Sequence, residues 1–237
     1  MDPRHRPLFV DARLADKDMC VYCGADYADT RDHVPSKVLL DEPYPEALPA
    51  VAACAACNWS FSLDEQYLAC FIECVVRGTA QPCGLQRAKV QRVLCDNPSL
   101  QQLIERCQKT LGGDLIWFPD LDRVRNVVLK LARGHAAYEL YPQLEDPNAV
   151  WFTPLLTFDQ AERREFENVI SSGPLGWPEI GTRAFYRASG DLPDKFQQSG
   201  DWVLVQPGRY RYAVYDAHGV SVKMVLSEYL ACEIIWE

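Results

Sequence analysis

The sequence predicts an α+β protein with three successive parts. Residues 19–57 hold two Cys-x-x-Cys pairs and several prolines, which favours short strands and loops over a long helix. Apolar residues recur at helical spacing over residues 62–140. Residues 202–236 contain four β-prone runs, which is typical of antiparallel strands. We therefore expect an N-terminal module at 1–83, a helical segment at 84–141 and a C-terminal α/β domain at 142–237, with a small antiparallel sheet and one helix.

The N-terminal module is expected to contain two short strands, near Thr30–Val34 and Ala50–Ala53, and a short turn of helix from Cys57. A longer helix should start at Ser62, because Ser62 and Glu65 have the spacing of a capping box. Gly78 can end this helix. The apolar face of the helix would consist of Leu63, Tyr67, Cys70, Phe71 and Cys74.

Three further helices are expected in the middle of the chain. One spans Gly84–Asp96. The next begins at Asn97-Pro98, because proline is favoured at the first helical position, and runs to Leu111 before Gly112-Gly113. The longest covers Leu121–Leu140. It has one apolar face, made by Val124, Val127, Val128, Leu131, Ala132 and Tyr138.

The C-terminal part changes to β-prone composition. A strand is expected at Val150–Thr153, a helix at Asp159–Ser171 and a Pro/Gly-rich loop at Gly173–Gly181. The four further strands are Trp202–Gln206, Arg209–Asp216, Val220–Leu226 and Tyr229–Trp236, with turns at Pro207-Gly208 and His218-Gly219.

Composition excludes several classes of protein. Hydrophobic residues make up 48% of the chain, which argues against disorder. No apolar run is long enough to span a bilayer, and no hydrophobic signal region follows Met1–Arg6. We therefore expect a soluble cytoplasmic protein without a membrane partner.

The net charge of −9 is unevenly distributed. Residues 1–83 carry −6, residues 84–133 carry +4 and residues 134–237 carry −7. The basic segment is either a face that contacts phosphates or an ordinary solvated helix surface.

Four of the ten cysteines form the pairs Cys20-x-x-Cys23 and Cys54-x-x-Cys57, with 30 residues between the pairs. Four thiolates at this spacing predict a tetrahedral structural zinc site. The remaining cysteines should pack as small hydrophobic residues: Cys70, Cys74, Cys83, Cys95, Cys107 and Cys232.

The loop between the pairs contains Asp32-His33, and Asn58 follows the last cysteine. Asp32 offers a carboxylate and Asn58 a carbonyl oxygen, the hard ligands that Mg²⁺ or Mn²⁺ prefers. An imidazole ordinarily titrates near pH 6.5, so His33 is suited to take a proton from water. Neighbouring strand residues point opposite ways, so Asp32 can face a metal while His33 faces the water.

The run Cys20-x-x-Cys23, Asp32-His33-x-Pro35, Cys54-x-x-Cys57-Asn58 resembles the HNH endonuclease family, over about residues 19–70. The resemblance implies a ββα-metal fold in which the four cysteines hold a structural zinc. It also implies that Asp32 and Asn58 bind a catalytic Mg²⁺ or Mn²⁺ and that His33 is the general base. The family further suggests DNA as the partner and a role in bacterial defence against foreign DNA.

Two positions depart from the family pattern. Ala47 stands where the family has an asparagine that orders the loop, and Asn58 stands where many members have histidine. An amide is a weaker ligand, so metal affinity is expected to be low. The alternative function is a catalytically inactive, zinc-stabilised module that binds nucleic acid or protein. RNA is the alternative substrate.

Other candidate residues have two interpretations each. Arg31 and Lys37 either contact phosphate or are solvated charges. Ser62 is more typical of a helix cap than of a metal ligand, and Asp64 and Glu65 suit the first turn of a helix. Tyr210 and Tyr212, which alternate with Arg209 and Arg211, either face the core or stack on bases. The other histidines are expected to be structural or on the surface: His5, His135 and His218. Residues 142–237 are expected to select the target, form a homo-oligomer or bind a regulatory protein.

Overall fold

The structure, a computed structural model, describes residues 19–46, 48–169, 182–189, 197–199, 202–216 and 219–237. It is an α+β protein, as predicted. The chain divides into two compact units: Met1–Ser60 with Val128–Glu237, and Phe61–Val127. This division differs from the three consecutive segments expected, since the second part of α5 (Leu121–Glu139) packs with both the N-terminal hairpin and the C-terminal sheet.

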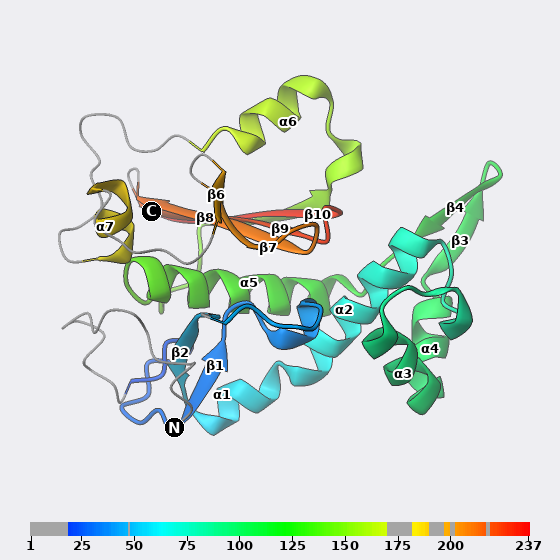
Figure 1. Cartoon of the computed structure of the whole chain (residues 1–237), viewed down its shortest axis with the longest axis horizontal. Coiled ribbons are helices and arrows are strands. Elements are labelled where there is room, and N and C mark those ends of the chain that lie inside the picture. The colour runs from blue at the N-terminus through cyan, green and yellow to red at the C-terminus, as the bar shows by residue number, and fades with distance from the viewer. Residues whose placement is uncertain (1–18, 47, 170–181, 190–196, 200–201, 217–218) are drawn as a thin grey trace. The chain divides into compact units, whose positions relative to one another are not determined.

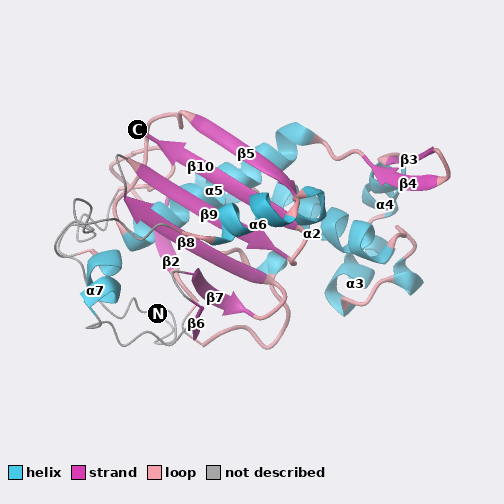
Figure 2. Cartoon of the chain, turned by 90° about the horizontal axis from the view of Figure 1, so that it is seen from above, coloured by secondary structure: helices cyan, strands magenta, loops and turns pink. Residues whose placement is uncertain are grey.

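The first unit is built on a six-stranded antiparallel sheet in the order β5-β10-β9-β8-β7-β6. Helix α5 lies along one face of the sheet and α6 (Gln160–Glu167) along the other (Figures 1 and 2). The strands are β5 (Ala149–Pro154), β6 (Gln197–Ser199), β7 (Trp202–Gln206), β8 (Tyr210–Asp216), β9 (Val220–Leu226) and β10 (Leu230–Trp236). Five of them confirm the expected strands, and β6 was not predicted.

Strand alternation explains why the sheet has two covered faces. In β8, Tyr210 and Tyr212 are 1% and 0% exposed and point toward α5, so the predicted core-facing row is confirmed. Tyr215, at odd spacing from them, lies on the face that carries α6. Asp159 caps α6, where its carboxylate accepts from the amide of Glu162 while the Glu162 carboxylate accepts from the amide of Asp159.

The N-terminal hairpin pairs β1 (Thr30–His33) with β2 (Ala50–Ala53) in antiparallel register, Asp32 opposite Val51. Helix α1 (Ala55–Ser60) follows directly. Both predicted strands are confirmed. A 3-10 turn, Lys37–Leu39, lies in the long connection, and Figure 1 shows α5 between this hairpin and the large sheet.

The second unit contains α2 (Ser62–Arg77), α3 (Ala88–Asp96), α4 (Pro98–Glu105) and a hairpin of β3 (Gln108–Leu111) with β4 (Asp114–Trp117). Its core gathers Tyr67, Cys70, Phe71, Cys74, Leu94 and Ile104. Leu63 is 70% exposed, so its predicted place on the buried face is wrong. Gly78, with φ of 69°, ends α2 as predicted.

The predicted start of α2 at Ser62 is confirmed, although the expected capping box does not form. The N-cap of α2 is Phe61 without a side-chain cap, because the backbone is already helical one residue before Ser62. Two other helix boundaries in the second unit were predicted wrongly, since α3 starts at Ala88 rather than Gly84 and α4 ends at Glu105 rather than Leu111. Residues 108–117 form a hairpin rather than the end of a helix. Gly112 and Gly113 both have positive φ, which suits a two-residue hairpin turn. Asn97 does cap α4, accepting from the amide of Leu100.

The remaining elements are short. They are the 3-10 turns Pro82–Gly84 and Leu155–Thr157 and helix α7 (Arg183–Ser189), none of which was predicted. The helix expected at Asp159–Ser171 is α6, but it ends at Glu167 because Asn168 has an extended backbone, so the predicted end at Ser171 is wrong. The expected loop at Gly173–Gly181 lies outside the described residues. Of the helices in the described ranges, none is long and apolar enough to cross a bilayer.

Candidate metal and catalytic site

The four predicted zinc ligands lie together. The Sγ atoms of Cys20, Cys23, Cys54 and Cys57 are all within 4.8 Å of one another. Those of Cys23 and Cys54 are 3.9 Å apart, against about 3.8 Å for two sulfurs on one tetrahedral zinc with Zn–S bonds near 2.3 Å. The donor set therefore fits a structural Zn²⁺.

Local backbone structure positions these thiols. Cys20 and Cys23 lie in a turn that Gly24 closes with φ of 71°, and the amide of Gly24 donates to the carbonyl of Cys20. Cys54 immediately precedes α1, and the amide of Cys57 donates to its sulfur at 3.4 Å. The pairing of β1 with β2 brings the two turns together.

The protein surroundings shift the thiol pKa values in opposite directions. Burial raises the pKa of Cys20, but backbone amides of Cys54, Tyr22 and Cys23 outweigh it and lower the pKa to about 7. Burial and the neighbouring thiols raise the pKa of Cys57. The thiolate form is thus favoured at Cys20 and disfavoured at Cys57, as expected for a cluster whose negative charge a metal ion would balance.

Asp32, the predicted carboxylate ligand, is 8% exposed and already holds a cation. Lys130 Nζ lies 2.6 Å from its Oδ2, and the Tyr22 hydroxyl donates to the same oxygen at 2.6 Å. Lys130 also donates to Ser36 Oγ at 2.7 Å. A divalent ion could therefore use Oδ1, the carboxylate oxygen that neither contact occupies.

His33 and Asn58 lie on adjacent elements. His33 ends β1 opposite Ala50 and is half-buried. Asn58, on α1, donates from Nδ2 to Thr30 Oγ1 at 3.1 Å, which leaves its carbonyl oxygen to serve as a ligand. The contacts thus tie Asp32 and Asn58 to different partners, Asp32 to Tyr22 and Lys130 and Asn58 to Thr30.

Other predicted residues take varied places. Arg31 is exposed on β1, and Lys37 Nζ lies 5.6 Å from the ring centroid of Tyr44. Ala47, His5 and His218 lie outside the described residues. Among the remaining cysteines, Cys70, Cys74 and Cys232 are buried as predicted and Cys107 is half-buried, whereas Cys83 and Cys95 are exposed.

Sequence reasoning missed Lys130 and Trp59. Lys130 is 2% exposed on the helix face that Val127 and Leu131 bury, so a charge within an apolar stripe was the signal for it. Trp59, which follows Asn58, is 73% exposed, and no periodic pattern marks it. His135, also on α5, is fully buried against Tyr210 and Tyr212, in agreement with a structural role.

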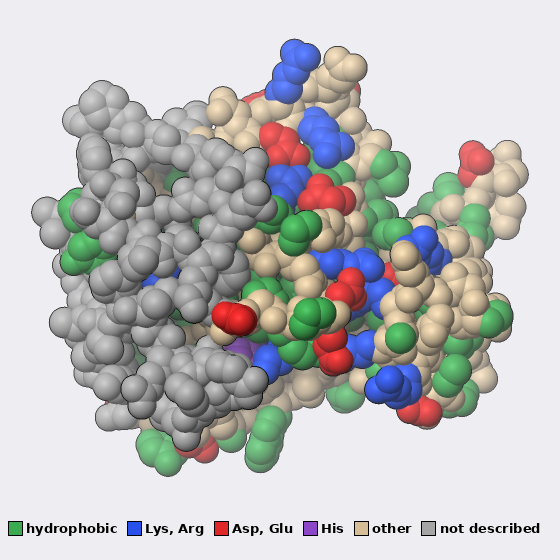
Figure 3. All heavy atoms as spheres, in the orientation of Figure 1, with side chains coloured by type: hydrophobic (Ala, Val, Ile, Leu, Met, Phe, Trp, Pro, Cys, Tyr) green, Lys and Arg blue, Asp and Glu red, His purple; other side chains and the backbone are tan. Residues whose placement is uncertain are grey.

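Several basic side chains of segment 84–133 are buried or form ion pairs within the protein. Arg87 and Lys130 are buried, and Arg123 pairs with Asp64 and Asp120. On the described surface visible in Figure 3, Lys and Arg side chains are interspersed with Asp and Glu. This distribution favours an ordinary solvated surface over one continuous phosphate-binding face.

The fold and site define an α+β protein with a four-cysteine cluster suited to zinc. Compared with known proteins, the chain matches no family model, no curated protein and no solved structure. The HNH resemblance therefore rests on the motif residues and their placement.

Proposed function

We propose that the chain is a metal-dependent endonuclease of the HNH type that hydrolyses DNA. The observation that carries the proposal is the order β1, β2, α1 around the cysteine cluster, with Asp32-His33 on the first strand and Asn58 on the helix. Zinc at the cysteines would keep the short hairpin rigid without a large core of its own.

In this proposal, His33 takes a proton from the water that attacks phosphorus. Asp32 and Asn58 would hold Mg²⁺ or Mn²⁺, which stabilises charge on the phosphate and the departing oxygen. The ammonium of Lys130, 2.6 Å from Asp32 Oδ2, restricts the orientation of the Asp32 carboxylate. Because Asp32 is already paired, we expect weak binding of the divalent ion.

The test is cleavage of supercoiled plasmid by the full chain with Mg²⁺ or Mn²⁺. His33→Ala should lower the rate by about 10²- to 10⁴-fold. Its zinc content should remain that of the wild type, which shows that the module is still folded. Asp114→Asn, at the exposed first residue of β4, is the control that should leave cleavage unchanged. An RNA substrate in the same assay distinguishes the two nucleic acids.

A catalytically inactive, zinc-stabilised binding module is the second candidate. The buried ion pair between Asp32 and Lys130 favours it, because a cation within the protein occupies the carboxylate expected to hold the metal. Equal residual cleavage by wild type and His33→Ala would indicate a contaminating nuclease and support this second function. Binding of labelled DNA without cleavage would then be its direct measurement.

A further inference from the structure

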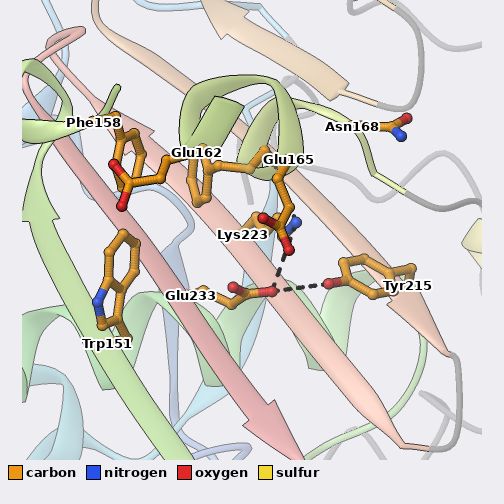
Figure 4. Close-up of a pocket in the computed structure, with 9 residues that line it drawn as sticks. Trp151, Phe158, Glu162, Glu165, Asn168, Tyr215, Lys223 and Glu233 are labelled. Atoms are coloured by element: carbon orange, nitrogen blue, oxygen red, sulfur yellow. Dashed lines mark hydrogen bonds and ion pairs between the residues drawn. The ribbon is translucent and has the colours of Figure 1, made fainter. Parts of the chain in front are cut away.

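A pocket of about 550 Å³ lies between α6 and the face of the sheet that α5 does not cover (Figure 4). None of its lining residues belongs to the candidate catalytic site. The lining is mainly aromatic and acidic: Trp151, Phe158, Glu162, Glu165, Phe166, Asn168, Tyr215, Lys223 and Glu233.

Strand register builds the floor of the pocket. Trp151 of β5 pairs with Glu233 of β10, and Glu233 pairs with Lys223 of β9. Side chains at facing positions of neighbouring strands project to the same face, so the three form a row. The Tyr215 hydroxyl, from β8, donates to Glu233 Oε1 at 2.9 Å.

The pocket already accommodates one ammonium group. Lys223 Nζ lies 5.4 Å from the ring centroid of Phe166, 5.7 Å from that of Tyr215 and 3.7 Å from Glu233 Oε1. Its side chain is only 8% exposed. Lys223 Nζ also donates to the carbonyl oxygen of Phe166 at 3.2 Å. Ring faces, a carboxylate and a carbonyl oxygen together thus stabilise a largely desolvated cation here.

Another aromatic pair and another carboxylate of the pocket are exposed to solvent. The rings of Trp151 and Phe158 stack with centroids 5.4 Å apart and planes 6° apart, and Trp151 is 40% exposed. Figure 4 shows the Glu165 carboxylate directed toward Glu233 and Lys223. Within the described part of the chain Glu165 forms no ion pair, and Glu162 uses one carboxylate oxygen to cap α6.

Charge selects the class of ligand. Three glutamates and one lysine give the lining a formal charge of −2. Phosphates and other anions are repelled by such a site, whereas a cation with an apolar stem gains both carboxylate and ring contacts. We propose that this pocket binds an alkylammonium group, with the stem against Trp151 and Phe158 and the charge at Glu165. The group can belong to a free polyamine or to a lysine side chain of a partner protein.

Calorimetric titration of the full chain with n-butylammonium chloride tests the proposal. Sodium butyrate, an anion with an alkyl chain of similar length, is the control ligand. Saturable binding of the ammonium and none of butyrate is expected. Spermidine and a short lysine-containing peptide then distinguish the two sources by which binds more tightly. Absence of saturable ammonium binding, or binding of butyrate instead, would overturn the proposal.

Variants locate the binding. Glu165→Gln, on the exposed side of α6, and Trp151→Leu should each weaken n-butylammonium binding by about fivefold. Asp114→Asn removes the same charge at a distant position in the sequence, the exposed first residue of β4, and should leave the affinity unchanged. Circular dichroism checks that each variant is folded. Equal weakening by Glu165→Gln and Asp114→Asn would mean general attraction to an acidic protein and refute the site.

Discussion

Lys130 Nζ lies 2.6 Å from Asp32 Oδ2, with the two side chains 1% and 10% exposed. The pair joins the middle of α5 to the strand that carries His33. The Tyr22 hydroxyl donates a hydrogen bond to Asp32, and Lys130 donates one to the Ser36 hydroxyl. The residue expected to bind a catalytic metal is therefore also part of the buried structure, and the two roles can be tested separately.

Breaking this pair should strongly destabilise the protein. Lys130→Met leaves a buried carboxylate uncompensated, and we expect the free energy of unfolding to fall by about 3–5 kcal/mol. Combining it with Asp32→Asn should destabilise less than the sum of the single changes, because neither partner then remains charged. Urea unfolding of the two single variants and the double variant measures these changes.

Arg163→Met, which breaks a more exposed pair with Glu167, is the control and should change stability by less than about 1 kcal/mol. Additive effects of the buried pair would contradict its direct coupling.

The cysteine cluster predicts one zinc ion per chain. Cys54→Ser should abolish bound zinc and lower the melting temperature, because a lost ligand opens the tetrahedral site. Metal analysis of the purified protein is the measurement. Cys95→Ser alters an exposed thiol on α3 and should retain both metal and stability. A metal-free wild-type protein, or zinc retained in Cys54→Ser, would rule out this site.

Gly134 allows α5 to approach the N-terminal hairpin closely. A Cβ at this position would lie 2.6 Å from Val34 Cγ2 and 3.2 Å from Tyr22 Oη. Glycine to alanine in a helix interior usually stabilises by about 1 kcal/mol, but here we expect Gly134→Ala to destabilise the protein. Adding Val34→Ala should relieve part of the clash. A plain gain in stability for Gly134→Ala would show that the helix and hairpin do not pack this tightly.

His135 should make stability depend on pH. Burial, together with the charge of Lys130, holds the pKa of His135 well below its usual 6.5. The unfolded chain, with an ordinary pKa, therefore binds a proton in acid that the folded chain does not. Stability from this residue is present above about pH 6.5 and falls below it by up to about 1.4 kcal/mol per pH unit. Unfolding of wild type and His135→Gln should converge as the pH is lowered from 7.5 to 5.5, a window set by the ordinary histidine pKa. Parallel stability curves would contradict a neutral buried imidazole.

Local sequence signals recovered most of the elements because each depends on near neighbours. The capping pair Asp159 and Glu162 lies at the start of α6, which agrees with the helix start predicted at Asp159. Asn97-Pro98 marked the start of α4 correctly. The hairpin at 108–117 was missed since its strands, QKTL and DLIW, lack clear alternation and only Gly112-Gly113 marks the turn. The capping box at Ser62 did not form because Ser62 is already the first residue of α2, and Phe61, which follows the end of α1, takes the N-cap position.

By itself, the sequence determined the two CxxC pairs, the strands around Asp32-His33 and the long helix from Leu121, since spacing along the chain specifies each of them. Only the tertiary structure decided that Lys130 from that helix would meet Asp32, 98 positions away in the chain. It also decided that Trp151, Lys223 and Glu233 would form one pocket floor. Both depend on strand register and on the side of α5 that becomes buried, which are set by packing among distant segments rather than by any local pattern.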